Sequence, residues 1–217
     1  MKNTLIYKTS IVLFSLTFLL SCKASNSTKG AGIGAGAGAV IGGLIGHQSG
    51  NTAVGAIIGA GVGGATGAII GEHMDKQAAE LRNDLKGATV ERVGEGIKIT
   101  FNSGLMFDFD SYNLTTGTKS NLTDLARTLN KYDDTNILIE GHTDSKGSED
   151  YNMTLSKKRS TSVESYLITQ EVKGGRISTQ GYGETQAISE VDEQNRRVEV
   201  AIYANKKMKR AAEKGQL

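Results

Sequence analysis

An acidic and a basic residue, fifteen positions apart, are the clearest candidates for chemistry in this sequence. Asp144 closely follows an apolar strand-like segment at 137–139, and Arg159 lies in a helix expected over about 155–170. On a helical wheel, Arg159 falls in the middle of the apolar arc of that helix. A buried guanidinium needs an anionic partner, because an unpaired buried charge is very costly. We therefore expect Asp144 and Arg159 to meet near one concave edge of the fold.

Two plainer interpretations of this pair stay open. The two residues could form a buried salt bridge that only stabilises the fold. Asp144 alone could cap a turn or a helix, as aspartate commonly does before a Gly/Ser-rich loop. A third charged residue, Arg196, begins a strand expected over 197–203 and shares the parity of its core-facing residues. It is therefore expected on the same side as the pair.

His142 invites a catalytic or metal-binding interpretation, because strand alternation places it on the same face as Asp144. The other histidines, His47 and His73, lie outside the globular segment, which excludes a histidine cluster there. A single cysteine excludes both a disulfide framework and a cysteine-based zinc site. No nucleophile is paired with a base and an orienting acid. We expect no enzyme activity, no metal and no cofactor, and a structural or rim role for His142.

The overall charge of the chain is balanced. Its 217 residues include 25 Lys+Arg and 23 Asp+Glu, a net charge of +2. A protein that coats nucleic acid carries a concentrated basic excess, so no nucleic-acid partner is expected. Aromatic residues make up 6% of the chain, with no Trp, which argues against a large aromatic ligand cage.

Residues 1–21 are organised like an export signal. A positively charged start is followed by a ten-residue apolar run at 11–20, about 15 Å as a helix and half of a bilayer core of about 30 Å. The run ends in Leu19-Leu20-Ser21-Cys22, which resembles the bacterial lipobox, where the cysteine is lipidated and becomes the new N-terminus. This resemblance predicts acyl chains on Cys22 that hold the protein on a membrane, followed by a linker over 22–29. Lys23, in place of an Asp, favours the outer membrane.

Residues 30–71 form a second unit with 16 glycines and no charged residue. Many glycines recur every four residues, which places small residues in one row along a helix and lets two backbones approach closely. A polar break at 47–52 divides the unit into two apolar arms, which predicts a helical hairpin. The pattern resembles the glycine-zipper segments of bacterial envelope lipoproteins, and a flexible tether is the alternative. A G-x-G-x-x-G match at 59–64 lacks the strand–turn–helix context of a dinucleotide site, so nucleotide binding is rejected.

The remaining segments supply the elements that must position the charged pair. Apolar residues recur at threes and fours over 72–88, which predicts a helical connector. Beyond it, a globular domain is expected over 89–205, with a charged tail over 206–217. Strands are expected at 97–101, 137–139, 176–182 and 197–203, and helices at 117–131 and 155–170. The order β-α-β-α-β-β predicts an α+β fold with a mixed sheet and helices packed on one face.

Four motifs in this segment occur in an order that is typical of one family. They are Gly141-His142-Thr143-Asp144, Tyr151-Asn152, Leu155-Ser156-x-x-Arg159 and Asn195-Arg196-Arg197-Val198-Glu199. Together they resemble the peptidoglycan-binding OmpA-like domain over about 97–204. With the lipobox and the glycine zipper in front, the whole chain resembles an OmpA-family outer-membrane lipoprotein.

The resemblance implies non-covalent binding of the diaminopimelate residue in the peptidoglycan stem peptide. Asp144 matches the aspartate that accepts the ligand's ammonium, and Arg159 matches the arginine that pairs with its carboxylate. Arg196 matches a supporting arginine near the pocket floor. The remaining matched positions are Thr143, Asn152 and Leu155 beside the charged pair, and Phe109 and Asp110 on the opposite loop. Ser160 and Lys158 depart from the family pattern without touching the pair.

Two functions follow from these expectations. In the first, a lipid-anchored protein of the outer membrane holds the cell wall through a globular domain in the periplasm. In the second, the glycine zipper oligomerises in or on a membrane, and the wall-binding domain only positions it. A third role, in the assembly of envelope proteins, is neither supported nor excluded by the residues.

Overall fold

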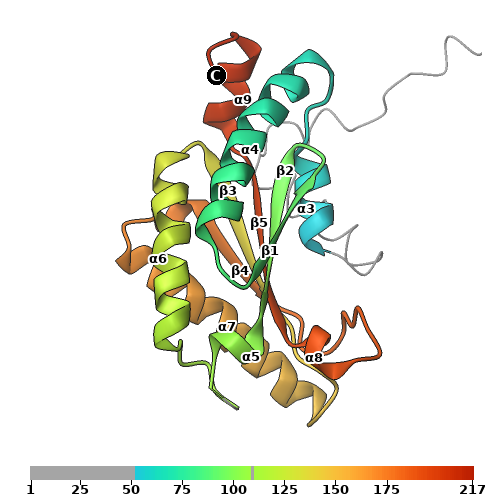
Figure 1. Cartoon of the computed structure of the whole chain (residues 1–217). Helices are drawn as coiled ribbons and strands as arrows, with labels where there is room; N and C mark the ends of the chain where they lie inside the picture. Colours follow the sequence, from blue (N-terminus) through green and yellow to red (C-terminus); the bar gives the residue numbers. More distant parts are fainter. Residues whose placement is uncertain (1–51, 109) are drawn as a thin grey trace, which may run out of the picture. The chain divides into compact units, whose positions relative to one another are not determined.

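A computed structural model describes residues 52–108 and 110–217 (Figure 1). The predictions for the export signal, the lipidated Cys22, the first zipper arm and Phe109 lie outside the described residues and stay predictions.

The described residues form a five-stranded mixed sheet with strand order β1-β2-β5-β3-β4. Only β3 and β4 pair in parallel, while the other neighbouring strands are antiparallel. The strands are β1 (Ala88–Val93), β2 (Gly96–Asn102), β3 (Thr135–Gly141), β4 (Ile177–Gly181) and β5 (Arg197–Ala204). From β2 onward the order β-α-β-α-β-β is as predicted, but β1 was not expected. This edge strand is half-exposed and carries charged residues, so its apolar alternation is weak.

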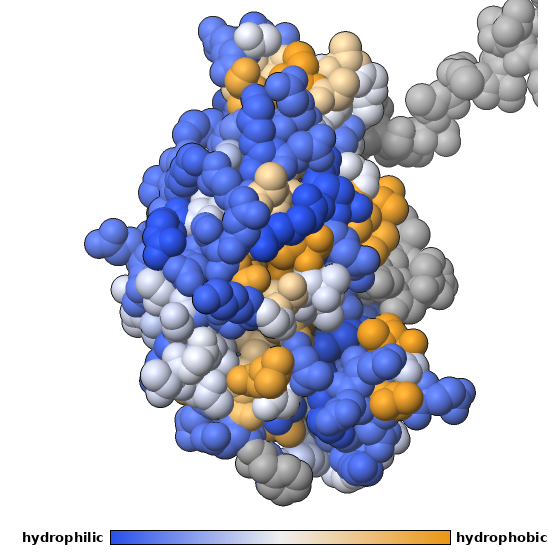
Figure 2. All heavy atoms as spheres, in the orientation of Figure 1, coloured by the Kyte–Doolittle hydropathy of each residue, from blue (hydrophilic) through white to orange (hydrophobic). Residues whose placement is uncertain are grey.

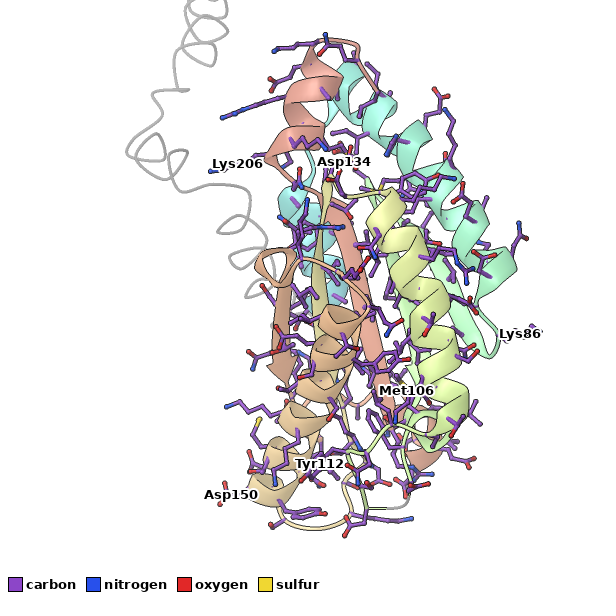
Figure 3. The ribbon with its side chains drawn as sticks, turned by 90° about the vertical axis from the view of Figure 1, so that its left-hand side faces the viewer. Lys86, Met106, Tyr112, Asp134, Asp150 and Lys206 are labelled. Carbon is purple, nitrogen blue, oxygen red and sulfur yellow. The ribbon has the colours of Figure 1, made fainter. Side chains whose placement is uncertain are left out.

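The helices predicted between the strands are present, and both begin at a capping side chain. In α6 (Thr116–Lys131), the Thr115 hydroxyl accepts from the amide of Thr118, and the apolar face is buried as predicted. In α7 (Glu149–Thr169), the Ser148 hydroxyl accepts from the amide of Tyr151. This cap begins α7 six residues before the predicted start at 155. Helix α7 lies against β3 and β4, and α6 lies against α7 (Figures 1 and 3).

The second zipper arm and the predicted connector are arranged differently from the expected hairpin arm. Two helices, α3 (Thr52–Ala60) and α4 (Gly64–Asp84), are separated by a break at 61–63. Gly63 and Gly64 have φ values of 67° and 62°, which residues other than glycine rarely adopt. The Glu95 carboxylate accepts hydrogen bonds from the amides of Val62 and Gly63 and so caps the start of α4.

Helices cover both faces of the sheet. Along β5, Val200 and Ile202 belong to the main core with α4, α6 and α7, whereas Ala201 and Tyr203 contact α3. Successive strand residues point to opposite faces, so α3 lies on the face opposite the main core (Figure 1). The one-sided arrangement predicted for the helices therefore describes α6 and α7 and does not include α3.

The segment expected as a charged tail also contains a helix, α9 (Lys206–Glu213). The Asn205 side chain caps it by accepting from the amides of Lys207 and Met208. Met208 and Ala212 are buried in the main core, where α9 packs against α4. Three short helical turns complete the described fold: α5 (Ser103–Met106), η2 (Gly174–Arg176) and α8 (Asp192–Asn195).

None of the helices in the described residues is long and apolar enough to cross a membrane. Figure 2 shows one face of the molecule, on which hydrophilic residues predominate and apolar side chains form small separate patches.

Candidate functional site

Three charged residues from separate segments meet where β3 ends and β5 begins. Asp144 follows β3 by three residues, Arg196 immediately precedes β5, and Arg159 lies in the middle of α7. Because β3 and β5 are antiparallel, with Gly141 opposite Val198, the end of one strand lies beside the start of the other.

These residues line a cavity of about 510 Å³. The cavity contains every predicted binding residue that the structure describes: Asp110, Thr143, Asp144, Asn152, Leu155, Arg159 and Arg196. Phe109 is outside the described residues. The other lining residues are Ser103, Gly104, Phe107, Asp108, Lys146 and Tyr151. The cavity lies at the end of the molecule where Figure 3 labels Tyr112, just before α6, and Asp150, in the first turn of α7.

The carboxylate of Asp144 is held by Arg196 and not by Arg159. Its Oδ2 lies 2.6 Å from Nη1 of Arg196, and its Oδ1 accepts a 3.2 Å hydrogen bond from the amide of Lys146. Asp144 is buried, while the Arg196 side chain stays partly exposed. The salt bridge between Asp144 and Arg159 that one sequence interpretation predicts is not formed. Arg196, expected in a supporting role, is the direct partner of Asp144.

Arg159 is a buried cation without a carboxylate partner in the described part of the chain. It is 6% exposed, its Nε donates to the carbonyl of Ser111 at 3.0 Å, and its guanidinium lies 5.2 Å from the ring centroid of Phe107. Burial lowers the pKa of Arg159, and the nearby Tyr151, Asp110 and Asp144 oppose this lowering. The charge of Arg159 is therefore balanced at longer range and not by a direct ion pair.

Two further predicted residues fix the loop that carries Asp144. The Asn152 side chain donates to the carbonyls of Asp144 and Lys146 at 3.2 and 3.1 Å, and to Oε2 of Glu184 at 2.6 Å. The Thr143 amide donates to the carbonyl of Gly183, and its buried hydroxyl has no hydrogen-bond partner among the described residues. This network places one side of the cavity at a fixed position relative to α7.

The other side of the cavity is joined to α7 by Tyr151. Its hydroxyl donates to the carboxylate of Asp110, a residue with a φ of 53° in the loop before α6. Leu155 is half-buried one turn further along α7. Tyr151 was not predicted to be a binding residue, although it belongs to the Tyr151-Asn152 motif. Ser148, followed by Glu149 and Asp150, is an N-cap signal that places Tyr151 in the first helical turn.

The cavity carries equal numbers of opposite charges. Its acidic residues are Asp108, Asp110 and Asp144, and its basic residues are Lys146, Arg159 and Arg196. A carboxylate binds a forked guanidinium in two hydrogen bonds, and an ammonium binds a carboxylate at a similar distance. This arrangement suits a small group that carries both an ammonium and a carboxylate.

A second cluster of ionisable groups lies on the α3 face of the sheet. Glu140 and Glu199 are direct partners across β3 and β5, and Arg197 donates from Nε to Oε1 of Glu199 at 2.6 Å. Burial and the facing Glu199 raise the pKa of Glu140 to about 8. Burial and Arg197 hold the pKa of His142 well below its usual range. His142 is 1% exposed and stacks on Tyr182, which suits a structural role.

Glu140, His142 and Glu199 each offer a ligand atom, and these atoms lie within 4.8 Å of one another. Carboxylate and imidazole groups at this spacing could surround a divalent cation. However, the Arg197 guanidinium already provides a positive charge to Glu199. We therefore assign no metal to this cluster.

Comparison with known proteins gives separate family matches for the N-terminal and the C-terminal part of the chain. Residues 106–201 match the OmpA family, and residues 1–75 match the YMGG-like Gly-zipper family. The probable lipoprotein YiaD of Escherichia coli is 40% identical over 140 residues, which are 61% of this chain and 64% of that protein. The chain thus spans less than two thirds of the length of this relative.

Two further relatives extend the comparison. The peptidoglycan-associated lipoprotein of Agrobacterium fabrum is 31% identical over 133 residues, which are 58% of this chain and 74% of that protein. The solved structure of the cell wall anchor of the T6SS from Pseudomonas aeruginosa superposes with a TM-score of 0.52 at 23% identity, covering 61% of this chain and 97% of that one. The latter similarity supports the fold. By the sequence matches, the chain belongs to the OmpA family.

Proposed function

We propose that this protein binds peptidoglycan without covalent attachment and tethers the outer membrane to the cell wall. The names of its relatives, a lipoprotein and a peptidoglycan-associated lipoprotein, support an envelope role. In this proposal Cys22 carries the lipid, the described domain lies in the periplasm, and the cavity at Asp144 and Arg159 binds the diaminopimelate residue of the stem peptide. The protein has no catalytic role.

The proposal rests mainly on the burial of Arg159 without a direct carboxylate partner among the described residues. A guanidinium that is 6% exposed, lines a cavity and has no direct carboxylate partner in the described chain is unfavourable for stability alone. A ligand carboxylate would supply the missing partner. Asp144, oriented by Arg196, would accept the ligand's ammonium, and the unpartnered Thr143 hydroxyl offers a neutral hydrogen bond.

Tethering does not require tight binding at one cavity. Many lipid-anchored copies face one polymer that repeats the same end group. The second and later contacts form at a high effective concentration, so moderate affinity at each site suffices.

Co-sedimentation with purified sacculi tests the proposal. The unlipidated chain from residue 23 to 217 is compared with Arg159→Ala and Asp144→Ala, and with Arg127→Ala as a matched control. Arg127 is exposed on α6 and pairs only with Asp124 among the described residues. We expect wild type and Arg127→Ala to sediment with sacculi and both cavity variants to stay in solution. Free diaminopimelate, but not lysine, should release the wild type. Binding that survives Arg159→Ala in a folded protein would contradict the proposal.

A zipper-based oligomer is the second candidate. Gly59 of α3 is exposed, so this part of the zipper row is open to a partner helix. By contrast, the glycines at 63 and 64 are required by the break before α4. Crosslinking of wild type and Gly59→Leu separates the candidates, since only a zipper oligomer is lost when residue 59 becomes bulky.

A further inference from the structure

Helix α3 is held by a small set of apolar contacts that is separate from the main core. Its buried residues pack with Ala201 and Tyr203 on one face of the sheet. These α3 residues are Ala53, Ala56, Ile57 and Ala60. The next helix, α4, instead contributes Ile70 and Met74 to the main core on the other face. Segments with separate contacts can open independently of the rest of a domain.

The α3 contacts bury little apolar surface for each residue. Three of the four buried apolar side chains of α3 are alanine, and Ile57 is the only large one. Apolar stabilisation is roughly proportional to buried area, so most of it depends on Ile57. The fit at Ile57 is close: a Cβ added at Gly96 would lie 2.6 Å from Cγ2 of Ile57.

The joint between α3 and α4 is a short non-helical segment. It consists of residues 61–63, with Val62 exposed and Gly63 at positive φ. The Glu95 carboxylate holds it through the amides of Val62 and Gly63, and both hydrogen bonds are exposed. Neither bond involves Ile70 or Met74, the α4 residues named above in the main core.

The first residue of α3 is fixed separately, on the polar side of the sheet. The Gln186 side chain donates to the Thr52 hydroxyl at 2.6 Å. Glu140 and Glu199 are buried on the same face, since they pair across β3 and β5 at positions that alternate with the main core. Removing α3 would expose the face of the sheet that carries these acids, and their hydration would offset part of the cost of losing its apolar contacts.

We propose that α3 is a releasable segment, which peels from the sheet under load while α4, the sheet and the cavity stay folded. The load itself rests on the proposed function, in which lipid holds Cys22 and the wall holds the cavity. Thr52, the first residue of α3, is the first described residue between these two points along the chain. Release of residues 52–63 adds about 40 Å of contour length, less the distance that the folded segment already spans. The tether would lengthen while the cavity keeps its ligand.

Single-molecule force measurement tests this proposal without peptidoglycan. The unlipidated chain, with Cys22→Ser, carries one handle at Asn51→Cys and one at Ser145→Cys. Ser145 is exposed and adjacent to Asp144, so the two handles pull between the residue before α3 and the cavity. We expect a first reversible step at low force, with the contour length of residues 52–63, before a second step in which the main core unfolds.

Two matched variants test whether the first step is the release of α3. Ile57→Ala should lower the force of the first step or remove the step, and should leave the second unchanged. Ile58→Ala removes a neighbouring side chain that is 64% exposed and should change neither step. Glu95→Gln, which weakens the joint, should also lower only the first force.

A single unfolding step for the whole domain would overturn the proposal, as would an effect of Ile57→Ala on the second step alone. Because no ligand is present, neither result bears on peptidoglycan binding. Conversely, loss of binding to sacculi would leave the release of α3 unaffected.

Discussion

The Asp144 carboxylate lies 2.6 Å from the guanidinium of Arg196, although the guanidinium of Arg159 lines the same cavity. The two arginines are therefore not equivalent. Arg196 satisfies a buried acid within the protein, whereas Arg159 is left without a direct ion pair in the described chain. We therefore infer that Arg196 maintains the structure of the cavity, whereas Arg159 is available to a ligand. Substitution of each arginine tests this difference.

Arg159→Leu should abolish binding to sacculi while leaving the free energy of unfolding unchanged or raising it. Arg159 loses hydration on burial and, among the described residues, recovers one hydrogen bond, to Ser111, and a contact with Phe107. Replacing such a charge with an apolar side chain is often neutral or stabilising. Urea denaturation and co-sedimentation on the same samples check both parts. A marked loss of stability would instead assign Arg159 to the framework of the fold.

Arg196→Ala should weaken both stability and binding. Within the part of the chain that the structure describes, the substitution leaves the buried carboxylate of Asp144 with the Lys146 amide as its one hydrogen-bond donor, which we expect to cost about 1–3 kcal/mol. Binding falls because the carboxylate is no longer oriented toward the ligand's ammonium. Urea denaturation gives the first effect and a sacculus-binding isotherm the second. Asp144→Asn in the Arg196→Ala background should restore stability but not binding, because it removes the unpaired charge.

The pH dependence of stability should reveal Glu140. Its pKa is about 8 in the folded protein, against an ordinary value of 4.5, so the folded state retains a proton that the unfolded state releases. This contribution is fully present below pH 4.5 and is lost as the pH rises through 8. His142 acts in the opposite direction, but only below pH 6.5, because its folded pKa is lowered. Between pH 6.5 and 8, stability should therefore fall with rising pH.

Urea denaturation across pH 6.5–8 measures this slope, which should not exceed about one proton per molecule. Glu140→Gln keeps the shape of the side chain and removes the titration, so its stability should be nearly independent of pH in this range. An unchanged slope in Glu140→Gln would show that another group is responsible.

The parts of the fold that were predictable from sequence are those with a strong local signal. Helix α6 has its apolar residues on one face and was predicted close to its actual bounds. Strand β3 was located by its apolar run at 137–139, and it extends two residues further at each end. The edge strand β1 was missed because its half-exposed pattern resembles a loop. Helix α9 was missed because two buried residues, Met208 and Ala212, are embedded in a charged sequence.

The candidate site, too, was predictable from the sequence only in part. Motif order indicated which residues would share a cavity, but not how they would pair. The partner of Asp144 lies 52 residues further along the chain and is set by the antiparallel register of β3 and β5. No local pattern encodes that register. In the glycine array, spacing every four residues cannot distinguish a partner helix from a side chain, and the Glu95 carboxylate occupies the space beside Gly67.

Gly67→Ala gives a direct test of this last relationship. A Cβ added at Gly67 would overlap the Glu95 carboxylate, which would have to move and release the amides of Val62 and Gly63. Although alanine favours a helix by up to about 1 kcal/mol over glycine, we expect Gly67→Ala to lower the free energy of unfolding. Gly117→Ala is the matched control, because that helical glycine has open space around it and should gain stability. In the Glu95→Ala background the overlap is absent, so Gly67→Ala should become stabilising there as well. If Gly67→Ala is stabilising even with Glu95 present, the Glu95 carboxylate can move away from residue 67 without a net loss of stability, which would contradict the prediction.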